Sequence, residues 1–259
     1  MRICFIYRWE NPIMAQVREL FKTEGATVDA IYPEKTLFNL TDLRVDYDLY
    51  LLKSGTDSAL SLAGMLHMMG AKIINPYPAV AMMRNKFIVM RALQAAGVPI
   101  PETYMASSVD DLLPLLKDGP LITKPYRGSR GIGIKVVHHA DDMKDLAGQK
   151  QILAQRYHTP DDSEGRFHKI FCIGDQIFGS KRIWPLRKYE DKLGEPYVIS
   201  PELEEIAYKI GDVFGITLYC ADIVISDGRP YVVDVNKFGS FMGVPNAPKL
   251  LVEHISTLV

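Results

Sequence analysis

The 259-residue chain has few of the features that mark secreted, metal-stapled or membrane proteins. Its three cysteines, Cys4, Cys172 and Cys220, are odd in number, far apart and set in apolar segments. They therefore fit reduced core thiols better than disulfides or a zinc site. No apolar run approaches membrane-spanning length, and the apolar N-terminus is too short for a secretion signal. We expect a cytoplasmic protein with no membrane partner.

The chain also lacks an excess of charge of either sign. Its 30 lysines and arginines nearly balance its 31 aspartates and glutamates, so we expect no general attraction to nucleic acid. Hydrophobic residues make up 47% of the sequence, which is enough for a sizeable core in one large or two small domains.

Two common nucleotide-binding motifs are missing as well. No Gly-x-Gly-x-x-Gly follows the first expected strand, where residues 8–12 read Arg-Trp-Glu-Asn-Pro, so a dinucleotide site there is disfavoured. The glycine-rich segment 127–133 lacks the Gly-Lys-Ser/Thr of a Walker loop and is expected to join two strands instead of opening a helix.

Residues 1–78 alternate short strands and helices, a pattern that predicts a small Rossmann-like domain with a parallel sheet. The expected strands are 2–7, 27–32, 48–52 and 71–74, and the expected helices are 12–24 and 58–69.

A second unit, 79–259, is predicted to mix helices with antiparallel strands, which makes the whole chain α/β with an α+β C-terminal part. Its expected helices are 79–96, ended by Gly97 and Pro99, then 140–146, 201–214 and 246–258; its expected strands are 120–125, 132–137, 151–156, 167–173 and 176–183. Residues 184–199 are predicted to form a long mobile loop.

The richest signal lies near the C-terminus, where Asp222 and Asp234 stand on two apolar segments joined by Asp227-Gly228. Asp-Gly favours a tight turn, so the segments should form a hairpin with the two acids facing each other. Asn236 follows Asp234 by two residues and should share its face. Oxygen ligands without His or Cys suit magnesium. The alternative is a pair of strand-end acids facing solvent.

Cations and glycines supply a candidate phosphate site. Lys124 ends an apolar strand just before segment 127–133, whose backbone N–H groups can surround an anion; a simple tight hairpin is the alternative. Lys86 lies on an amphipathic helix and could belong to a solvated face. The strand 152–158 leads into a polar turn whose backbone could bind a purine edge.

Taken in order, these motifs resemble the ATP-grasp superfamily over residues 79–259, with 1–78 similar to the layer that precedes that fold. Asn75-Pro76, Asn85-Lys86, segment 96–103 and segment 124–131 are similar to RimK-type carboxylate-amine ligases. The resemblance implies a central lid subdomain of about 98–156 and a C-terminal subdomain of about 157–259.

The same resemblance implies roles for individual residues. Asp222, Asp234 and Asn236 would hold two Mg²⁺ ions, for which Mn²⁺ can substitute. The implied ATP-binding residues are Lys86, Lys124, Gly128, Ser129, Arg130, Gly131, Gln155, Arg156, Tyr157 and His158, of which 155–158 form the adenine hinge. Arg182, Lys169 and Lys53 are the predicted acceptor contacts, because they are cations near the expected cleft.

Departures from the ligase pattern leave alternatives open. RimK-type ligases usually carry Glu at the position of Asp234, Arg at that of Lys169, and Asn-x-x-Pro where this chain reads Asn236-Lys237-Phe238-Gly239. Inositol-polyphosphate kinases of the same superfamily are similar at 234–236, 167–171 and 52–57. We favour a ligase acting on a small molecule or peptide, over a kinase of a polyol or inositol phosphate.

A third reading is an ATP-binding regulatory module without turnover, against which the intact metal set argues. The sequence does not decide between a monomer and a homo-oligomer.

Overall fold

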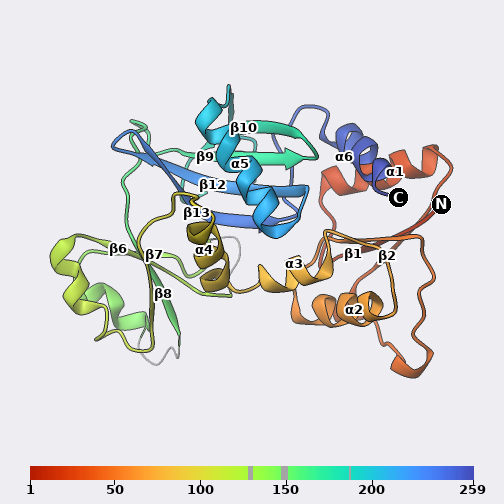
Figure 1. Ribbon diagram of the computed structural model, residues 1–259, viewed down its shortest axis with the longest axis horizontal. Coiled ribbons are helices and arrows are strands. Elements are labelled where there is room, and N and C mark those ends of the chain that lie inside the picture. Colours follow the sequence, from red (N-terminus) through yellow and green to blue (C-terminus); the bar gives the residue numbers. More distant parts are fainter. Residues whose placement is uncertain (128–130, 147–150, 187) are drawn as a thin grey trace.

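The computed structural model describes residues 1–127, 131–146, 151–186 and 188–259, and its strands form three sheets (Figure 1). The N-terminal sheet has the order β2-β1-β3-β4 and is parallel throughout, as the alternating pattern predicts. Its elements are β1 Arg2–Ile6, α1 Pro12–Thr23, β2 Thr27–Ile31, β3 Leu49–Leu52, α2 Asp57–Met68 and β4 Ile73–Ile74.

Local sequence explains where α1 begins and which face it buries. Asn11 caps the helix by accepting a hydrogen bond from the Met14 N–H, and Pro12 occupies the first turn, where its missing N–H costs nothing. Met14, Val17 and Phe21 follow at helical spacing and are buried. They cover one face of the parallel sheet.

The C-terminal sheet is antiparallel, in the order β11-β10-β9-β12-β13. Asp227 and Gly228 both have positive φ and close the β12–β13 hairpin, as expected of an Asp-Gly turn. The elements of this part are β9 Phe167–Ile173, β10 Gln176–Arg182, β11 Glu195–Tyr197, α5 Pro201–Phe214, β12 Leu218–Ser226, β13 Arg229–Lys237 and α6 Ala247–Thr257.

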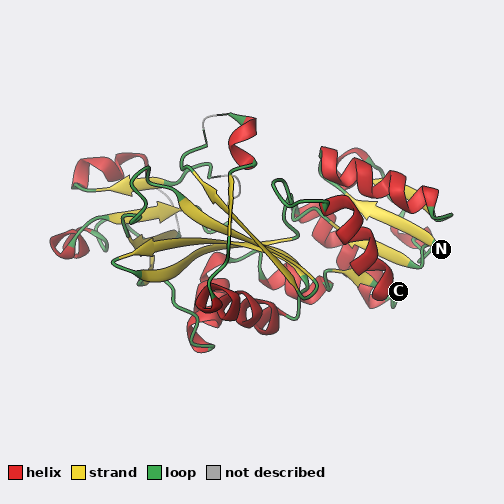
Figure 2. Ribbon diagram, turned by 90° about the horizontal axis from the view of Figure 1, so that it is seen from above, coloured by secondary structure: helices red, strands yellow, loops and turns green. Residues whose placement is uncertain are grey.

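The central sheet has the order β5-β8-β6-β7 and a hydrophobic core of its own, built around Leu121, Val137 and Ala154. Its strands are β5 Thr103–Ala106, β6 Leu121–Lys124, β7 Lys135–Val137 and β8 Ile152–Arg156. Seen from above, it forms one end of the molecule, away from both chain termini (Figure 2).

Two sequence-based expectations need correction. The helix expected over 79–96 is two helices, α3 Tyr77–Met82 and α4 Lys86–Ala95, because Asn85 adopts extended backbone angles and its side chain caps α4 at the Phe87 N–H. The short helix expected over 140–146 is present and is of the 3₁₀ type. The loop expected over 184–199 contains a short helix, Tyr189–Lys192, and strand β11.

One hydrophobic core joins the two ends of the chain. It contains buried residues of β1, α1, β9, β12 and α6. Helix α6 lies beside α1 in both views, so the last helix packs against the first (Figures 1 and 2). Across the described ranges, no helix combines the length and the apolar character needed to cross a membrane.

Candidate active site

The acidic side chains meet on one face of the C-terminal sheet. Asp222 on β12 lies directly opposite Asp234 on β13 and, on its other side, opposite Lys169 on β9. Paired residues of neighbouring strands point to the same face, so the three side chains form one row, with Asn236 two residues along from Asp234. The hairpin and the facing acids predicted from sequence are confirmed.

Each acid in this row has a lysine partner. Lys169 donates a hydrogen bond to Asp222, and Lys86, the first residue of α4, donates one to Asp234. Burial alone would raise the pKa of Asp234, but Lys86 and Lys124 outweigh it and leave that pKa lowered. Burial would likewise lower the pKa of Lys169, but Asp222 leaves it raised. Asp234 is therefore held ionised beside cations.

This donor set fits magnesium. Two carboxylates and a carboxamide supply hard oxygen atoms, and Mg²⁺ takes few protein ligands when nucleotide phosphates and water complete its shell. Within the described ranges no cluster of three or more His, Cys, Asp or Glu residues is arranged to hold a metal, which disfavours a dedicated all-protein cage. Lys86 and Lys169 now neutralise the charges that a metal would neutralise.

Lys124, at the end of β6, reaches the same region from the central sheet. Its Nζ donates to Gln155 Oε1 at 2.7 Å and to the Val233 carbonyl at 2.9 Å. The strand pairing shifts between Asp222 and Ile223, and Val233 is the extra residue that this bulge leaves unpaired. Burial lowers the pKa of Lys124 to about 8. The ammonium has no carboxylate hydrogen-bond partner.

The side chains of the expected adenine hinge, at the end of β8, mostly contact other parts of the protein. Gln155 is fully buried, accepts from Lys124 and donates to Thr103 Oγ1 at 3.0 Å. Arg156 turns its guanidinium to the Gly119 carbonyl at 2.7 Å, within the central sheet's own connections. His158 stacks on Tyr231 of β13 at a centroid distance of 3.8 Å. The polar turn expected at the end of β8 thus begins after Arg156.

Two further predicted site cations, Lys53 and Arg182, have no carboxylate partner among the described residues; Arg182 is buried and Lys53 is half-buried. Lys53 follows β3 and donates to the carbonyls of Phe238 and Gly239, at 2.7 and 2.8 Å. Arg182, the last residue of β10, donates to the Met242 carbonyl at 2.6 Å, and its Nε has no hydrogen-bond partner. Carbonyl dipoles satisfy N–H groups but leave the positive charges in place.

The segment that offers these carbonyls has an unusual backbone. Phe238 and Phe241 adopt left-handed angles, with φ of 61° and 54°, which bulky residues rarely do. At Gly239 a Cβ atom would lie 2.9 Å from the Cys220 sulfur. Such strain persists when the surroundings fix it, and it is concentrated at functional sites.

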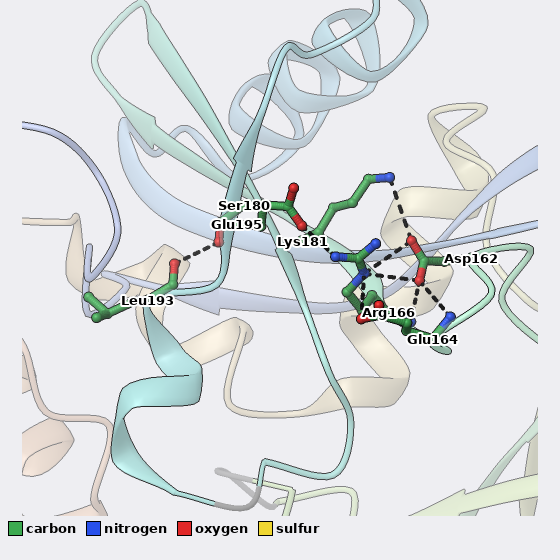
Figure 3. A network of polar contacts seen from close by, with 7 residues as sticks. All are labelled: Asp162, Glu164, Arg166, Ser180, Lys181, Leu193 and Glu195. Carbon is green, nitrogen blue, oxygen red and sulfur yellow. Dashed lines mark hydrogen bonds and ion pairs between the residues drawn. The ribbon is translucent and has the colours of Figure 1, made fainter.

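At Gly194 the backbone lies close against Ser180 and Arg182. A Cβ atom there would lie 2.2 Å from Ser180 Oγ and 2.8 Å from Arg182 Cγ. The Ser180 hydroxyl donates to the Leu193 carbonyl at 2.8 Å (Figure 3). This close approach requires glycine, and it fixes the start of the Arg182 side chain.

Outside the cleft, an ionic network anchors the same strands (Figure 3). Arg166 Nε donates to Asp162 at 3.0 Å and also pairs with Glu195 on β11, while Lys181 on β10 lies 3.6 Å from Asp162. The hydrogen bond from Arg166 lowers the pKa of Asp162 to about 2. The network therefore stays ionised at neutral pH.

The structure thus brings most of the predicted site residues together around β9, β12 and β13. Gly128, Ser129 and Arg130 lie outside the described residues, while Gly131 has φ of 72° and approaches Trp184. Sequence analysis missed Thr103, Tyr231 and the Val233 carbonyl, which have no local signal, because each acts through a partner distant in the sequence.

Comparison with known proteins agrees with this geometry. The sequence pattern of the RimK-like ATP-grasp domain matches residues 83–247, which is more than half of the chain. The chain belongs to the RimK-like ATP-grasp family. A probable alpha-L-glutamate ligase of Pseudomonas putida strain GB-1 is 27% identical over 207 residues, covering 73% of this chain and 68% of that protein.

Solved structures extend the similarity over the whole fold. A RimK-domain ATP-grasp protein of Sphaerobacter thermophilus matches with a TM-score of 0.82 at 17% identity, covering 98% of this chain and 99% of the other. The ATP-grasp ligase PsnB, solved with a minimal precursor, Mg and ADP, matches with a TM-score of 0.73 at 15% identity, covering 100% and 97%.

The α/β fold and the ligase class predicted from the sequence are thereby confirmed, and the kinase alternative is not favoured. In a RimK-like ATP-grasp protein, the row of Asp222, Asp234 and Asn236 is the natural candidate for the metal-binding edge of the active site.

Proposed function

We propose that this ligase activates a substrate carboxylate with ATP and then joins it to an amine. The observation that carries the proposal is a pair of cations, the half-buried Lys53 and the buried Arg182, which have no carboxylate partner among the described residues; Arg182 lies near Asp222 in the row of acids. A buried cation without a counter-ion is costly, and an anionic substrate supplies the missing partner.

The nucleotide lies on the other side of that row. Lys86 and Lys124 contact its phosphates, and Asp222, Asp234 and Asn236 hold two Mg²⁺ ions, which Mn²⁺ can replace. PsnB was solved with Mg and ADP, which supports this nucleotide and metal. Bound Mg²⁺ would neutralise charge on the phosphates, and Lys86 and Lys169, no longer paired with the acids, would be free to bind anionic oxygens.

The chemistry then takes two balanced steps. A carboxylate oxygen of the acceptor attacks the terminal phosphorus of ATP, the bond to the bridging oxygen breaks, and ADP leaves. The amine nitrogen next attacks the acyl carbon, loses a proton, and expels inorganic phosphate. Arg182 and Lys53 stabilise negative charge on the acyl phosphate, and their burial keeps water away from it.

The substrate class follows from the same cations and from the relatives. The similar protein from Pseudomonas putida is named an alpha-L-glutamate ligase, and PsnB was solved with a precursor, so we infer a small molecule or peptide as acceptor. The three cysteines are buried and free, which supports work in a reducing compartment such as the cytoplasm.

The deciding experiment is a count of phosphate. Purified protein is incubated with Mg-ATP and a pooled metabolite and peptide extract, and the new product mass is identified. With the identified substrates, ADP and inorganic phosphate should appear in equal amounts, and omission of the amine should suppress steady turnover. A stable phosphorylated alcohol with no free phosphate would overturn the proposal in favour of a kinase.

A further inference from the structure

A second group of cations lies where the N-terminal sheet meets β13. Lys237, the last residue of β13, lies against Gly55 in the segment between β3 and α2. A Cβ atom at Gly55 would be 2.9 Å from Lys237 Cε and 3.1 Å from its Nζ. Among the described residues, Lys237 has no hydrogen-bond or ion-pair partner. Because residue 55 has no side chain, the Lys237 ammonium can lie against its backbone.

Arg84, between α3 and α4, approaches the same point. Its Nε is buried and has no hydrogen-bond partner. It lies 3.7 Å from Asp57 Oδ1, at the first residue of α2, but the Asp57 side chain is 77% exposed, so this ion pair is weak. Arg84 thus lies beside the first residue of α2, and its charge acts on Lys237.

The charges at this point do not balance. Arg84 and Lys86 both act on Lys237 as like charges, and Asp234, the nearby acid, already accepts a hydrogen bond from Lys86. The 12-residue helix α2 adds the positive end of its dipole, which begins directly after Thr56. The other acids found here among the described residues, Glu34 and Asp57, are exposed, and Glu34 accepts from the Thr56 hydroxyl. Two cations beside this helix N-terminus therefore favour a further anion.

We propose that Lys237, Arg84 and the N-terminus of α2 form a second anion subsite, which binds an oxyanion of the acceptor a few bonds from the carboxylate that reacts. The proposal rests on the proposed function, because it takes Lys53 as a contact of the reacting end. Lys53 and Gly55 are two residues apart on one segment, so a single short substrate can span both points. The oxyanion is a carboxylate or a phosphate monoester, and the acceptor carries at least two negative charges.

Binding, not turnover, tests this subsite, so its failure is distinct from failure of the ligase reaction. The full-length protein with Mg and a non-hydrolysable ATP analogue is titrated with unbranched dicarboxylates from malonate to adipate. Monocarboxylates of equal length serve as reference, and 3-phosphonopropionate represents the phosphate class.

At least one dianion should bind on the order of tenfold tighter than its monoanionic match, as expected for one charge-assisted contact. Which series binds better identifies the oxyanion as carboxylate or phosphate. If no dianion exceeds its monoanionic match, the proposal is overturned.

Two variants test which residues cause the preference for dianions over monoanions. Lys237→Met should remove most of it and leave monocarboxylate binding unchanged. Gly55→Ala keeps every charge but places a methyl group where the Lys237 ammonium lies, so it should weaken dianion binding several-fold. Lys249→Met, which changes an exposed lysine on α6, is the matched control and should change nothing. An unchanged preference in a folded Lys237→Met protein would also overturn the proposal.

Discussion

The two halves of the active site hold their cations in different ways. On the acid side, Lys86 and Lys169 donate to Asp234 and Asp222, so each positive charge is neutralised by a carboxylate. On the acceptor side, Lys53 and Arg182 donate to main-chain carbonyls of residues 238–242, and their charges remain.

The difference separates two tasks. A lysine paired with a carboxylate could exchange that partner for a phosphate if a metal took over the acid, which agrees with the proposed binding of Mg-ATP on the acid side. A cation held by carbonyls is fixed in place and still attracts an anion, so the acceptor side is preorganised. Substitutions on the two sides should therefore affect different steps.

The largest effect on turnover is expected when a charge is removed from the acid side. Asp234→Asn keeps the volume but loses the carboxylate, so turnover with saturating substrates should fall at least about a hundredfold. Steady-state ADP release measures this, with circular dichroism as the check on folding. Asp145→Asn, an exposed acid paired with Lys135, is the control. Near-wild-type turnover at moderate magnesium would show that Asp234 is structural.

Removing charge from the acceptor side should affect a different constant. Arg182→Met should reduce kcat/KM for the acceptor about 10- to 100-fold, as expected for loss of a charge-assisted contact of about 1.5–3 kcal/mol. The dissociation constant of Mg-ATP should not change. Lys181→Met alters the preceding residue of β10, whose side chain points to the other face of the sheet. This variant should leave both constants unchanged. Weaker ATP binding in Arg182→Met would contradict the division into two sides.

Lys124 tests whether the nucleotide belongs to the acid side. Lys124→Ala should weaken ATP binding about tenfold, because it removes a charge-assisted contact with phosphate. Gln155→Leu, which removes the amide that holds Lys124, should have a smaller effect in the same direction. Calorimetry with Mg and an ATP analogue measures both. Unchanged affinity in a folded Lys124→Ala protein would refute the phosphate contact.

The smallest expected effect is a pH dependence on the acceptor side. Burial lowers the pKa of Lys53 to about 8, so its positive charge is present at pH 7 and lost as pH rises through 8. At saturating Mg-ATP, kcat/KM for the acceptor should therefore decline a few-fold between pH 7 and 9. Lys53→Arg, which stays charged, should lack this decline. A profile that is the same in both proteins would assign the pH dependence to another group.

Much of this arrangement can be predicted from sequence, because its signals are local. The Asp227-Gly228 turn and the period-two placement of Asp234 and Asn236 predict the hairpin and the face on which these side chains lie. Proline and an asparagine cap give α1. These features depend on neighbours a few residues apart.

The remainder depends on contacts between distant segments. The bulge that turns the Val233 carbonyl toward Lys124 has no sequence signature, and neither has the turn of the Arg156 guanidinium away from the cleft. Asn85 is a capping residue by type, yet it was read as part of one long helix, because apolar residues continue on both sides of it. Lys237 follows Asn236 in the sequence and departs from the ligase pattern there, but its contact with Gly55 is set by the fold and has no local signal.

Helix α6 also determines the order in which the protein can be completed during synthesis. The first strand and the last helix share one core, so the apolar face of α1 and of the N-terminal sheet stays partly uncovered until residues 247–257 leave the ribosome. By then the central sheet, whose core is separate, has been available to fold for about a hundred residues of translation. The central sheet can therefore be folded before the core that α1 shares with α6 is complete.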